Sequence, residues 1–352
     1  MFHKRLTLLF VTALAGLLLP LVATAQVQLP LSEPLVGTQG STVGPDGALY
    51  VTERLAGRIS RVDPWTGHVS TFAEGLPVPA IDIGVGGATD VAFIDGVAYA
   101  LVTVVGPGLD EICVFVLGEA PGCAGTDGVG IYRIDGPSSV SLVADLGTFS
   151  SNNPPATGFF LGQGVQYSIE PFRGGLLVAD GHHNRVLWVS AEGYISEFKV
   201  FGNIVPTGLE VHGKTVLMAE AGPIPHVPAD GKVIAIDAKS GDSWEIASGA
   251  PLLVDVEFGL GRSLYALAQG EWCPPGETPP TCGKMDGAPA EPNGGSLVQV
   301  NADGSFTEIA GGLNLPTSLE FIGNTAFIVN LAGEIWVIED VSAPPFGRGR
   351  KH

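Results

Sequence analysis

Short runs of apolar residues, separated by turn residues, follow one another along the chain after residue 25. No segment there shows the long apolar periodicity of a helix, because Gly or Pro interrupts nearly every window of about ten residues. Apolar runs of roughly four to eight residues, bounded by turn signals, are typical of β-strands. The pattern predicts an all-β protein, as a sandwich, barrel or propeller, and argues against helical bundles and Rossmann folds.

One short pattern recurs six times. It has a glycine-like residue, an apolar residue two positions later, another apolar residue three positions after that, and then Asp or a substitute. The copies are GRISRVD (57–63), VGIYRID (129–135), NRVLWVS (184–190), GKVIAID (231–237), GSLVQVN (295–301) and GEIWVIE (333–339). They start on average about 55 residues apart, the size of one propeller blade with some long loops.

Further apolar runs accompany these copies. A run after a turn precedes each copy, at residues 48–51, 98–101, 176–179, 216–219, 264–267 and 326–329. Additional strands are expected ahead of that run, as at 89–93, 207–211, 253–258 and 317–321, and after the copy, at 69–73, 140–144, 195–200, 243–247 and 306–310. Four strands per repeat predict a single-domain six-bladed β-propeller of four-stranded antiparallel blades over residues 26–340.

The last repeat has no outer strand, because the chain becomes APPFGRGRKH soon after Asp340. The segment 27–36 precedes the first blade and has no place of its own. We expect it to pair as the missing outer strand of the last blade, so that an N-terminal strand closes the ring and covers its edge. Residues 341–352 are predicted to be a disordered basic tail.

The first 25 residues have the features of an export signal. A basic start at Lys4 and Arg5 is followed by an apolar run and by the small residues Ala23-Thr24-Ala25. The run is shorter than the roughly 20 residues that span a bilayer, so a retained anchor is the less favoured alternative. We expect a signal peptide over 1–25, cleavage near Ala25, and a periplasmic or secreted protein.

Four cysteines suit that compartment. Cys113 and Cys123, and likewise Cys273 and Cys282, stand close together in Gly- and Pro-rich stretches. Four cysteines allow three pairings, of which the local one closes two short loops and is favoured. A zinc site is the alternative, although zinc sites have closer cysteine spacing and usually histidine.

Composition and charge limit the classes of function that the chain can have. The chain has 50 Gly and 27 Pro but 45% hydrophobic residues, which indicates a folded protein with many turns. Its formal charge of −19 repels a polyanionic backbone, so nucleic acid is not an expected partner. The nucleophile elbow, P-loop, His-Glu-x-x-His and zinc-finger motifs are absent from the sequence.

Several segments resemble the ScyD/ScyE family of exported propeller proteins, which is linked with gene clusters for the pigment scytonemin. They are GPDGALYV (44–51), TDVAF (89–93), GLLVAD (175–180), PTGLEV (206–211) and NADGSFTEIAGGLNLPTSL (301–319). VADGHHNRVLWV (178–189) is more loosely similar to NHL-repeat propellers. The resemblance implies an exported propeller, with a hint of an accessory role in secondary metabolism, and carries over no catalytic residue. GVQYSIE (164–170) departs from the Asn-Pro-Tyr-Gly-like start that the family commonly has at the third blade.

One polar position follows the second strand of every blade. It is occupied by Glu53, Thr103, Asp180, Glu220, Gln269 and, within one residue, Asn330. Equivalent positions of a propeller lie on one rim, where oxygen ligands could bind Ca²⁺ or a polyol. The favoured interpretation is structural: each acid accepts N–H bonds from the following turn, since a ligand site needs only a few blades.

A second set comes from the starts of the first strands, which approach the axis: Asp90, Tyr167, Thr207, Asp255 and Thr317. Propeller lactonases of the gluconolactonase type bind a divalent metal in this region. Asp90 and Asp255 are therefore the candidate metal ligands, and Thr207 and Thr317 are counted with the rim as ligand contacts. Solvated carboxylates are the alternative.

His182 and His183 form a pair that could ligate a metal or act as a base, although a structural or surface role is favoured. A quinone-dependent dehydrogenase is disfavoured because the blades contain few basic residues. The leading hypothesis is a non-catalytic, monomeric binding or scaffold protein that uses one propeller face for a small molecule, glycan or protein. The alternative is a divalent-metal-dependent lactonase or hydrolase acting through Asp90 and Asp255.

Overall fold

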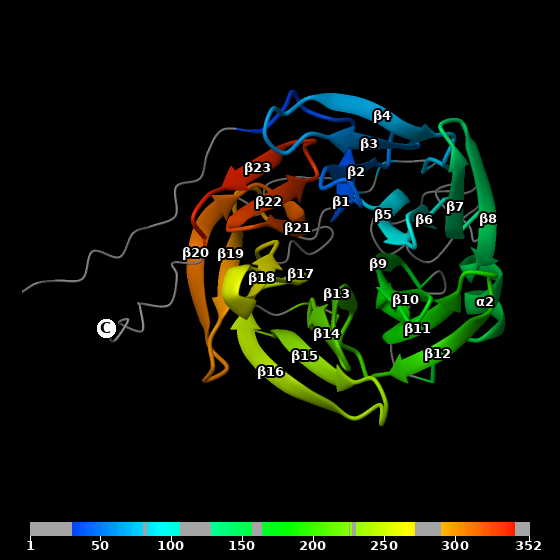
Figure 1. Cartoon of the computed structure of the whole chain (residues 1–352). Coiled ribbons are helices and arrows are strands. Elements are labelled where there is room, and N and C mark those ends of the chain that lie inside the picture. The colour runs from blue at the N-terminus through cyan, green and yellow to red at the C-terminus, as the bar shows by residue number, and fades with distance from the viewer. Residues whose placement is uncertain are drawn as a thin grey trace, which may run out of the picture.

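Six antiparallel sheets stand around one axis in a computed structural model (Figure 1), which describes residues 30–79, 82, 84–105, 128–156, 164–224, 226, 230–271 and 290–341. The first strand of each sheet is innermost and the sheets follow one another in chain order. The predicted all-β, six-bladed propeller is confirmed. The four cysteines, the predicted signal peptide and residues 342–352 lie outside the described residues.

The strand bounds follow the predicted repeats closely. Blade 1 comprises β1 (Thr38–Val43), β2 (Leu49–Glu53), β3 (Arg58–Val62) and β4 (Val69–Glu74), and blade 2 comprises β5 (Gly87–Ile94), β6 (Val97–Thr103), β7 (Gly130–Gly136) and β8 (Ser139–Asp145). Blade 3 comprises β9 (Gln166–Phe172), β10 (Gly175–Asp180), β11 (Arg185–Ser190) and β12 (Ile195–Val200), and blade 4 comprises β13 (Pro206–His212), β14 (Thr215–Glu220), β15 (Gly231–Asp237) and β16 (Ser243–Ala250). Blade 5 comprises β17 (Leu253–Phe258), β18 (Leu264–Ala268), β19 (Gly295–Val300) and β20 (Phe306–Leu313), and blade 6 comprises β21 (Pro316–Ile322), β22 (Thr325–Asn330) and β23 (Ile335–Ile338).

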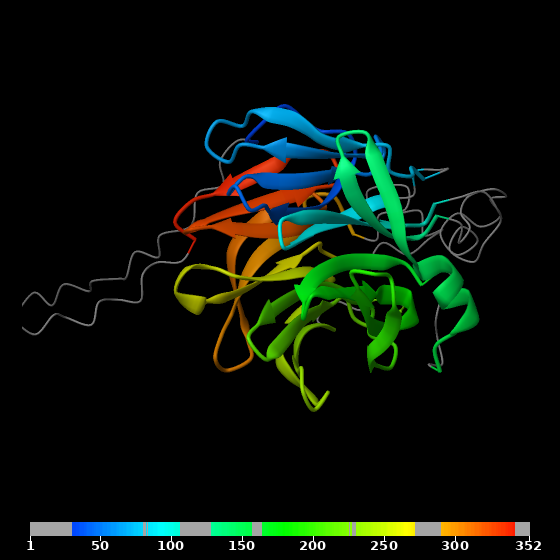
Figure 2. The same ribbon diagram turned by 45° about the vertical axis from the view of Figure 1, so that its right-hand side comes forward.

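Three short helical elements are found among the described residues. Helix α2 (Leu146–Asn152) lies at the outside of the ring between blades 2 and 3 (Figures 1 and 2), and the side chain of Asp145 caps it by accepting from Thr148 N. The 3₁₀ turns η1 (Gly181–His183) and η2 (Leu260–Arg262) follow β10 and β17. Within the described residues, no helix is long and apolar enough to cross a membrane.

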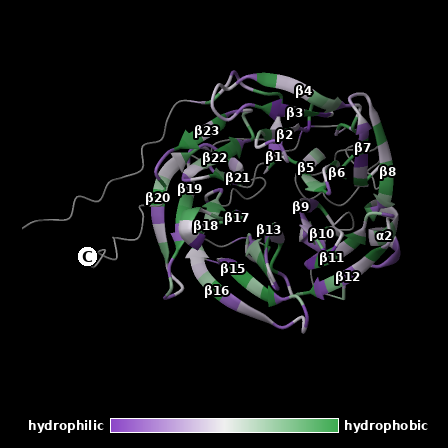
Figure 3. Cartoon of the chain, viewed as in Figure 1, coloured by the Kyte–Doolittle hydropathy of each residue, from purple (hydrophilic) through white to green (hydrophobic). Residues whose placement is uncertain are grey.

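The hydrophobic core lies between neighbouring sheets. Hydrophobic residues recur along the strands of every blade (Figure 3), and the buried clusters each join adjacent blades. One cluster joins Leu49 and Val51 of blade 1 to Phe327 and Val329 of blade 6, across the point where the ring closes. Burial of both faces of the middle strands explains their continuous apolar runs.

The N-terminal segment completes the last blade. Leu31 N donates to Ile335 O (2.8 Å) and Leu35 N donates to Gly333 O (2.8 Å), so residues 31–35 lie antiparallel beside β23. The sheet of blade 6 nevertheless has three regular strands, because these two bonds do not extend into a continuous ladder. The predicted closing position is therefore found, although the segment is not a regular strand.

Deleting residues 26–36 is expected to lower the melting temperature markedly. The deletion uncovers β23 and removes Leu35, which packs in the cluster that joins blades 1 and 6. Thermal unfolding followed by circular dichroism measures the effect. Val36→Ser, at a residue that is 47% exposed, is the control and should change little. An unchanged melting temperature after the deletion would contradict this closure.

A β-bulge recurs near the start of the inner strands. The pairing shifts between Ala88 and Asp90 in β5, between Leu253 and Asp255 in β17, and between Pro316 and Ser318 in β21, with comparable shifts in the other blades. A bulge inserts one residue and turns its side chain away from the regular alternation. The bulged position is therefore available for contacts with the next blade.

A residue at the start of each inner strand has a left-handed backbone. It is the residue before the strand in five blades and the first strand residue in β5, and φ lies between 46° and 81°: Gly37, Gly87, Val165, Val205, Leu252 and Leu315. This conformation is costly for Val and Leu. In blades 3 to 6 its carbonyl accepts from the residue beyond the second strand, as in Ala221 N to Val205 O (3.0 Å). Repetition around the ring indicates a structural role.

Candidate functional site

The inner strands begin, and the second strands end, on the same side of the ring, because neighbouring strands are antiparallel. We call this side the proximal face. It comprises the first residues of the innermost strands and the residues that follow β2, β6, β10, β14, β18 and β22. Most of the polar positions predicted from the sequence lie at or just inside it.

Asp90 and Asp255 join neighbouring blades. Asp90 Oδ1 accepts from Val91 N (2.9 Å), and its Oδ2 accepts from Ile169 N in blade 3 (2.8 Å). Asp255 repeats the arrangement, accepting from Val256 N (2.9 Å) and from Leu319 N in blade 6 (2.7 Å). Burial raises the pKa of Asp90 well above its ordinary value and that of Asp255 to about 7. All four carboxylate oxygens therefore serve as hydrogen-bond acceptors for the backbone.

Thr207 and Thr317 occupy a different position from these aspartates. Both are bulge residues, one position before the level of Asp90 and Asp255. Thr207 Oγ1 donates to Leu253 O in blade 5 (2.9 Å), and Thr317 Oγ1 donates to Gln39 O in blade 1 (2.6 Å). The set predicted as one ring is thus two adjacent levels, and both levels link blades.

A layer of four glutamates was missed in the sequence. Glu170, Glu210, Glu257 and Glu320 occupy one register position of β9, β13, β17 and β21, opposite Leu177, Leu217, Tyr265 and Phe327. Thr42 and Ala92 hold the equivalent positions of blades 1 and 2. The signal was a glutamate three residues after the bulge in the inner strand of four consecutive blades.

These four side chains face one another across the axis. Burial raises the pKa of each glutamate, and repulsion from the other acids raises it further; the pKa of Glu210 reaches about 7. The charge of Glu170 in blade 3 contributes to the raised pKa of Glu320 in blade 6. No Arg, Lys or His within the described part of the chain forms an ion pair with them. We call this group the axial glutamate layer.

No group of three or more His, Cys, Asp or Glu side chains that could hold a metal ion occurs among the described residues. Asp90 and Asp255 come from opposite blades, and their oxygens already accept backbone N–H bonds. Within residues 30–341, where described, the donor set for the Ca²⁺ or the lactonase metal considered from the sequence is therefore not assembled.

The predicted rim residues differ in their partners. Glu53 accepts from Val36 N (2.8 Å) and from Arg58 Nε (2.7 Å) and Nη2 (2.6 Å), and Asn330 Oδ1 accepts from Glu334 N (3.0 Å). Glu220 is 3% exposed, and burial raises its pKa to about 7. Gln269 Nε2 donates to Pro316 O (3.3 Å).

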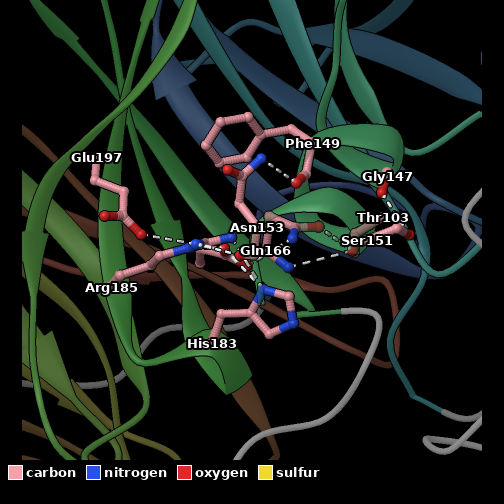
Figure 4. Close-up of polar contacts among 10 residues, drawn as sticks. Thr103, Gly147, Phe149, Ser151, Asn153, Gln166, His183, Arg185 and Glu197 are labelled. Carbon is pink, nitrogen blue, oxygen red and sulfur yellow. Dashed lines mark hydrogen bonds and ion pairs between the residues drawn. The ribbon is translucent and has the colours of Figure 1, made fainter. Parts of the chain in front are cut away.

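Asp180 belongs to a buried network that joins blades 2 and 3 (Figure 4). Arg185, fully buried, donates to Asp180 Oδ2 (2.7 Å) and Glu197 Oε1 (2.9 Å). Gln166 Nε2 donates to Asp180 Oδ1 (2.7 Å), while its Oε1 accepts from Thr103 Oγ1 in blade 2 (2.8 Å). Burial alone would raise the pKa of Asp180, but hydrogen bonds and charge interactions with His183 and Arg185 leave it below its ordinary value.

The two adjacent histidines have different surroundings. His183 Nδ1 lies 3.1 Å from Arg185 Nη2 within the buried network. His182 Nε2 lies 2.9 Å from the hydroxyl of Tyr167, and His182 Nδ1 has no hydrogen-bond partner in the described part of the chain. Burial, together with His226 and His183, lowers the pKa of His182 to about 3, so its imidazole is neutral at ordinary pH.

Unpartnered polar atoms gather at the proximal face. Within the described ranges, these atoms are Gln39 Oε1, Arg54 Nε and Nη1, His182 Nδ1 and Gln269 Oε1, on residues between 2% and 8% exposed. Gln39 is the second residue of β1, whereas Arg54, His182 and Gln269 come just after β2, β10 and β18. Each buried polar group without a partner costs about 1–3 kcal/mol. A ligand on this face could provide the missing bonds.

The fold and these contacts define a six-bladed β-propeller protein with a polar proximal face. Among solved structures, the chain is similar to a gluconolactonase from Xanthomonas campestris, with a TM-score of 0.57, 11% identity and 90% of each chain covered. It is also similar to virginiamycin B lyase from Staphylococcus aureus, with a TM-score of 0.52, 17% identity, and 89% of this chain and 99% of that chain covered.

A third similar structure is the PQQ-bound aldose sugar dehydrogenase from Streptomyces coelicolor, with a TM-score of 0.53, 13% identity, and 89% of this chain and 97% of that chain covered. Identities this low show a shared fold and leave the chemistry open. No protein-family model and no curated protein sequence matches the chain.

Proposed function

We propose that the chain is an exported, non-catalytic binding protein whose proximal face takes a small molecule rich in hydroxyl groups. The observation that carries this proposal is the set of unpartnered buried atoms on Gln39, Arg54, His182 and Gln269. The set mixes donors and acceptors, as a hydroxylated ligand requires, since each hydroxyl both donates and accepts. Export and an accessory role in secondary metabolism rest on the N-terminal sequence and on the ScyD/ScyE resemblance.

The surroundings of His182 suit a neutral hydrogen-bonding partner. The His182 ring stands beside Tyr167, and apolar residues including Val205, Ala221 and Leu252 pack around that tyrosine. Its pKa of about 3 means that it carries no charge when it binds. A neutral imidazole nitrogen beside apolar side chains suits a neutral hydrogen-bonding group.

The inter-blade bonds of Asp90 and Asp255 favour binding over metal-dependent hydrolysis. A lactonase mechanism would need those carboxylates to leave Ile169 N and Leu319 N in order to coordinate a metal. Breaking these bonds would also remove one polar link between blades 2 and 3 and one between blades 5 and 6. We therefore assign the two aspartates to the integrity of the ring, with the metal-dependent lactonase as the alternative.

Two assays on the purified protein separate these functions. Glucono-δ-lactone hydrolysis, measured with and without EDTA and alongside metal analysis, should show no stoichiometric metal and no chelator-sensitive turnover. Isothermal titration with D-glucitol should show binding, and Gln269→Ala and His182→Ala should each weaken it by roughly tenfold, as expected for one lost hydrogen bond from a desolvated site.

The control is Glu192→Gln, at an exposed turn residue between β11 and β12, which should leave glucitol binding unchanged. Chelator-sensitive turnover would establish the lactonase instead. Glucitol binding that is the same in Gln269→Ala, His182→Ala and the unaltered protein would place the ligand away from the proximal face.

A further inference from the structure

Arg54 is the most unusual polar residue of the proximal face. It directly follows β2, and its backbone N–H donates to Gly37 O (2.9 Å). Its side chain is 3% exposed and forms one ion pair, from Nη2 to Asp82 Oδ1 (2.6 Å), whereas the side chain of Asp82 is 50% exposed. Among the residues that the structure describes, Nε and Nη1 have no partner. A buried guanidinium with unmade hydrogen bonds is costly, so an additional acceptor is expected there.

The junction between blades 1 and 2 differs from the other junctions. Side chains at the starts of the inner strands link blade 2 to 3 through Asp90, 4 to 5 through Thr207, 5 to 6 through Asp255 and 6 to 1 through Thr317, and Ser168 Oγ donates to Thr207 O between blades 3 and 4. Among the described residues, no side-chain hydrogen bond joins β1 to β5. Gln39, at the level in β1 that Thr207 and Thr317 hold in their strands, has no partner for its Oε1 among the described residues.

The strands of this junction are nevertheless close together. A Cβ atom on Gly40 would lie 2.3 Å from Thr89 O, and one on Gly87 would lie 2.5 Å from Arg54 O. Arg54 and the start of β5 are therefore immediate neighbours. Blades 1 and 2 are therefore in contact, and their inner strands differ from the others only in lacking a side-chain hydrogen bond between them among the described residues.

The charges around the axis favour an anion at this junction. The axial glutamate layer comes from blades 3 to 6, while Thr42 and Ala92 hold its positions in blades 1 and 2. Arg54 thus lies on the side of the ring that contributes no glutamate to the layer. The chain has a formal charge of −19, yet in its described part the buried Arg54 side chain pairs with one acid, Asp82. A carboxylate on a ligand would give this cation a second acidic partner.

We propose that the junction of blades 1 and 2 is an anion subsite, where Arg54 binds the carboxylate of a small hydroxy acid and Gln39 accepts from a neighbouring hydroxyl. This assignment rests on the proposed function and adds the charge of its ligand. Arg54 Nε and Nη1 provide donors for the carboxylate oxygens, and Gln39 Oε1 provides the acceptor. The ligand class is a polyhydroxylated carboxylate.

D-Gluconate and D-glucitol are matched probes, because they differ only in a carboxylate that replaces a terminal hydroxymethyl group. Isothermal titration of the full protein should show gluconate binding at least tenfold tighter than glucitol. Raising the ionic strength should weaken gluconate binding and leave glucitol binding unchanged, because screening acts on the charged ligand alone.

Two variants are expected to change the preference for gluconate over glucitol in opposite directions. Arg54→Met should reduce gluconate affinity to the level of glucitol. Asp82→Asn, at a half-exposed residue, should strengthen gluconate binding, because it removes the carboxylate that competes for Arg54. Arg133→Met, which removes an exposed arginine of blade 2, is the control and should leave both affinities unchanged. The Asp82 variant and the salt dependence keep the test valid if Arg54→Met does not fold.

Equal binding of gluconate and glucitol, or a preference for gluconate that survives Arg54→Met, would overturn the anion subsite while the proposed binding function stands. If gluconate weakens in Arg54→Met but glucitol never binds, the subsite is supported and the wider hydroxyl-binding face is not. Absence of binding by either probe would contradict both.

Discussion

Glu257→Gln is expected to stabilise the propeller above neutral pH and to leave its stability near pH 4 almost unchanged. Burial and four neighbouring acids raise the pKa of Glu257 well above 4.5 in the folded protein. Between that ordinary value, which applies to the unfolded chain, and the folded value, the folded state holds a proton that the unfolded state has lost. Stability therefore falls as pH rises through this range, and glutamine removes the loss.

The expected gain at about pH 8 is roughly 1–3 kcal/mol, the usual cost of a buried polar group that lacks a partner. Urea unfolding at both pH values measures it. Glu192→Gln, on an exposed turn, is the control and should show no such pH dependence. An equal change at the two pH values would show that Glu257 acts through packing rather than through its charge.

Arg185→Met is expected to destabilise the protein by roughly 3–5 kcal/mol, because it leaves the carboxylate of Asp180 buried without its cation. Both residues are fully buried, and their 2.7 Å hydrogen bond is part of the network that joins blade 3 to Thr103 of blade 2. Thermal or urea unfolding measures the loss.

The double variant Asp180→Leu/Arg185→Met should recover most of that stability, since replacing both partners leaves no buried unpaired charge. Arg133→Met, which breaks an exposed ion pair in the neighbouring blade, should have little effect. If the double variant were as unstable as the single one, the loss would come from the packing of the arginine side chain and not from its charge.

The strands could be predicted because their signals are local. Apolar runs between turn residues locate β10 and β14, for example, from the residues within each run alone. Repetition of the runs then indicates the number of blades. The closing position of residues 31–35 could be predicted in the same way, from the missing outer strand of the last repeat.

The positions of side chains on the inner strands were harder to predict, because a bulge shifts the register of each strand. Thr317 is the inserted residue of the bulge in β21, whereas Asp255 is the residue after the bulge in β17. Counting residues from the start of each strand does not distinguish these two positions, and it therefore assigned both side chains to one ring. The axial glutamate layer was visible as a recurring glutamate, but its meaning depends on side chains of blades 3 to 6 meeting across the axis.

The amino-acid sequence by itself determined the fold class, the number of blades, the order of the strands and the polar positions at the strand ends. These follow from patterns within a few residues and from their repetition. Only the tertiary structure decided that Asp90 and Asp255 link blades, that burial lowers the pKa of His182, and that the buried Arg54 side chain pairs with Asp82. Hydrogen-bond partners and burial arise between residues far apart in the chain, and no local pattern encodes which of them will meet.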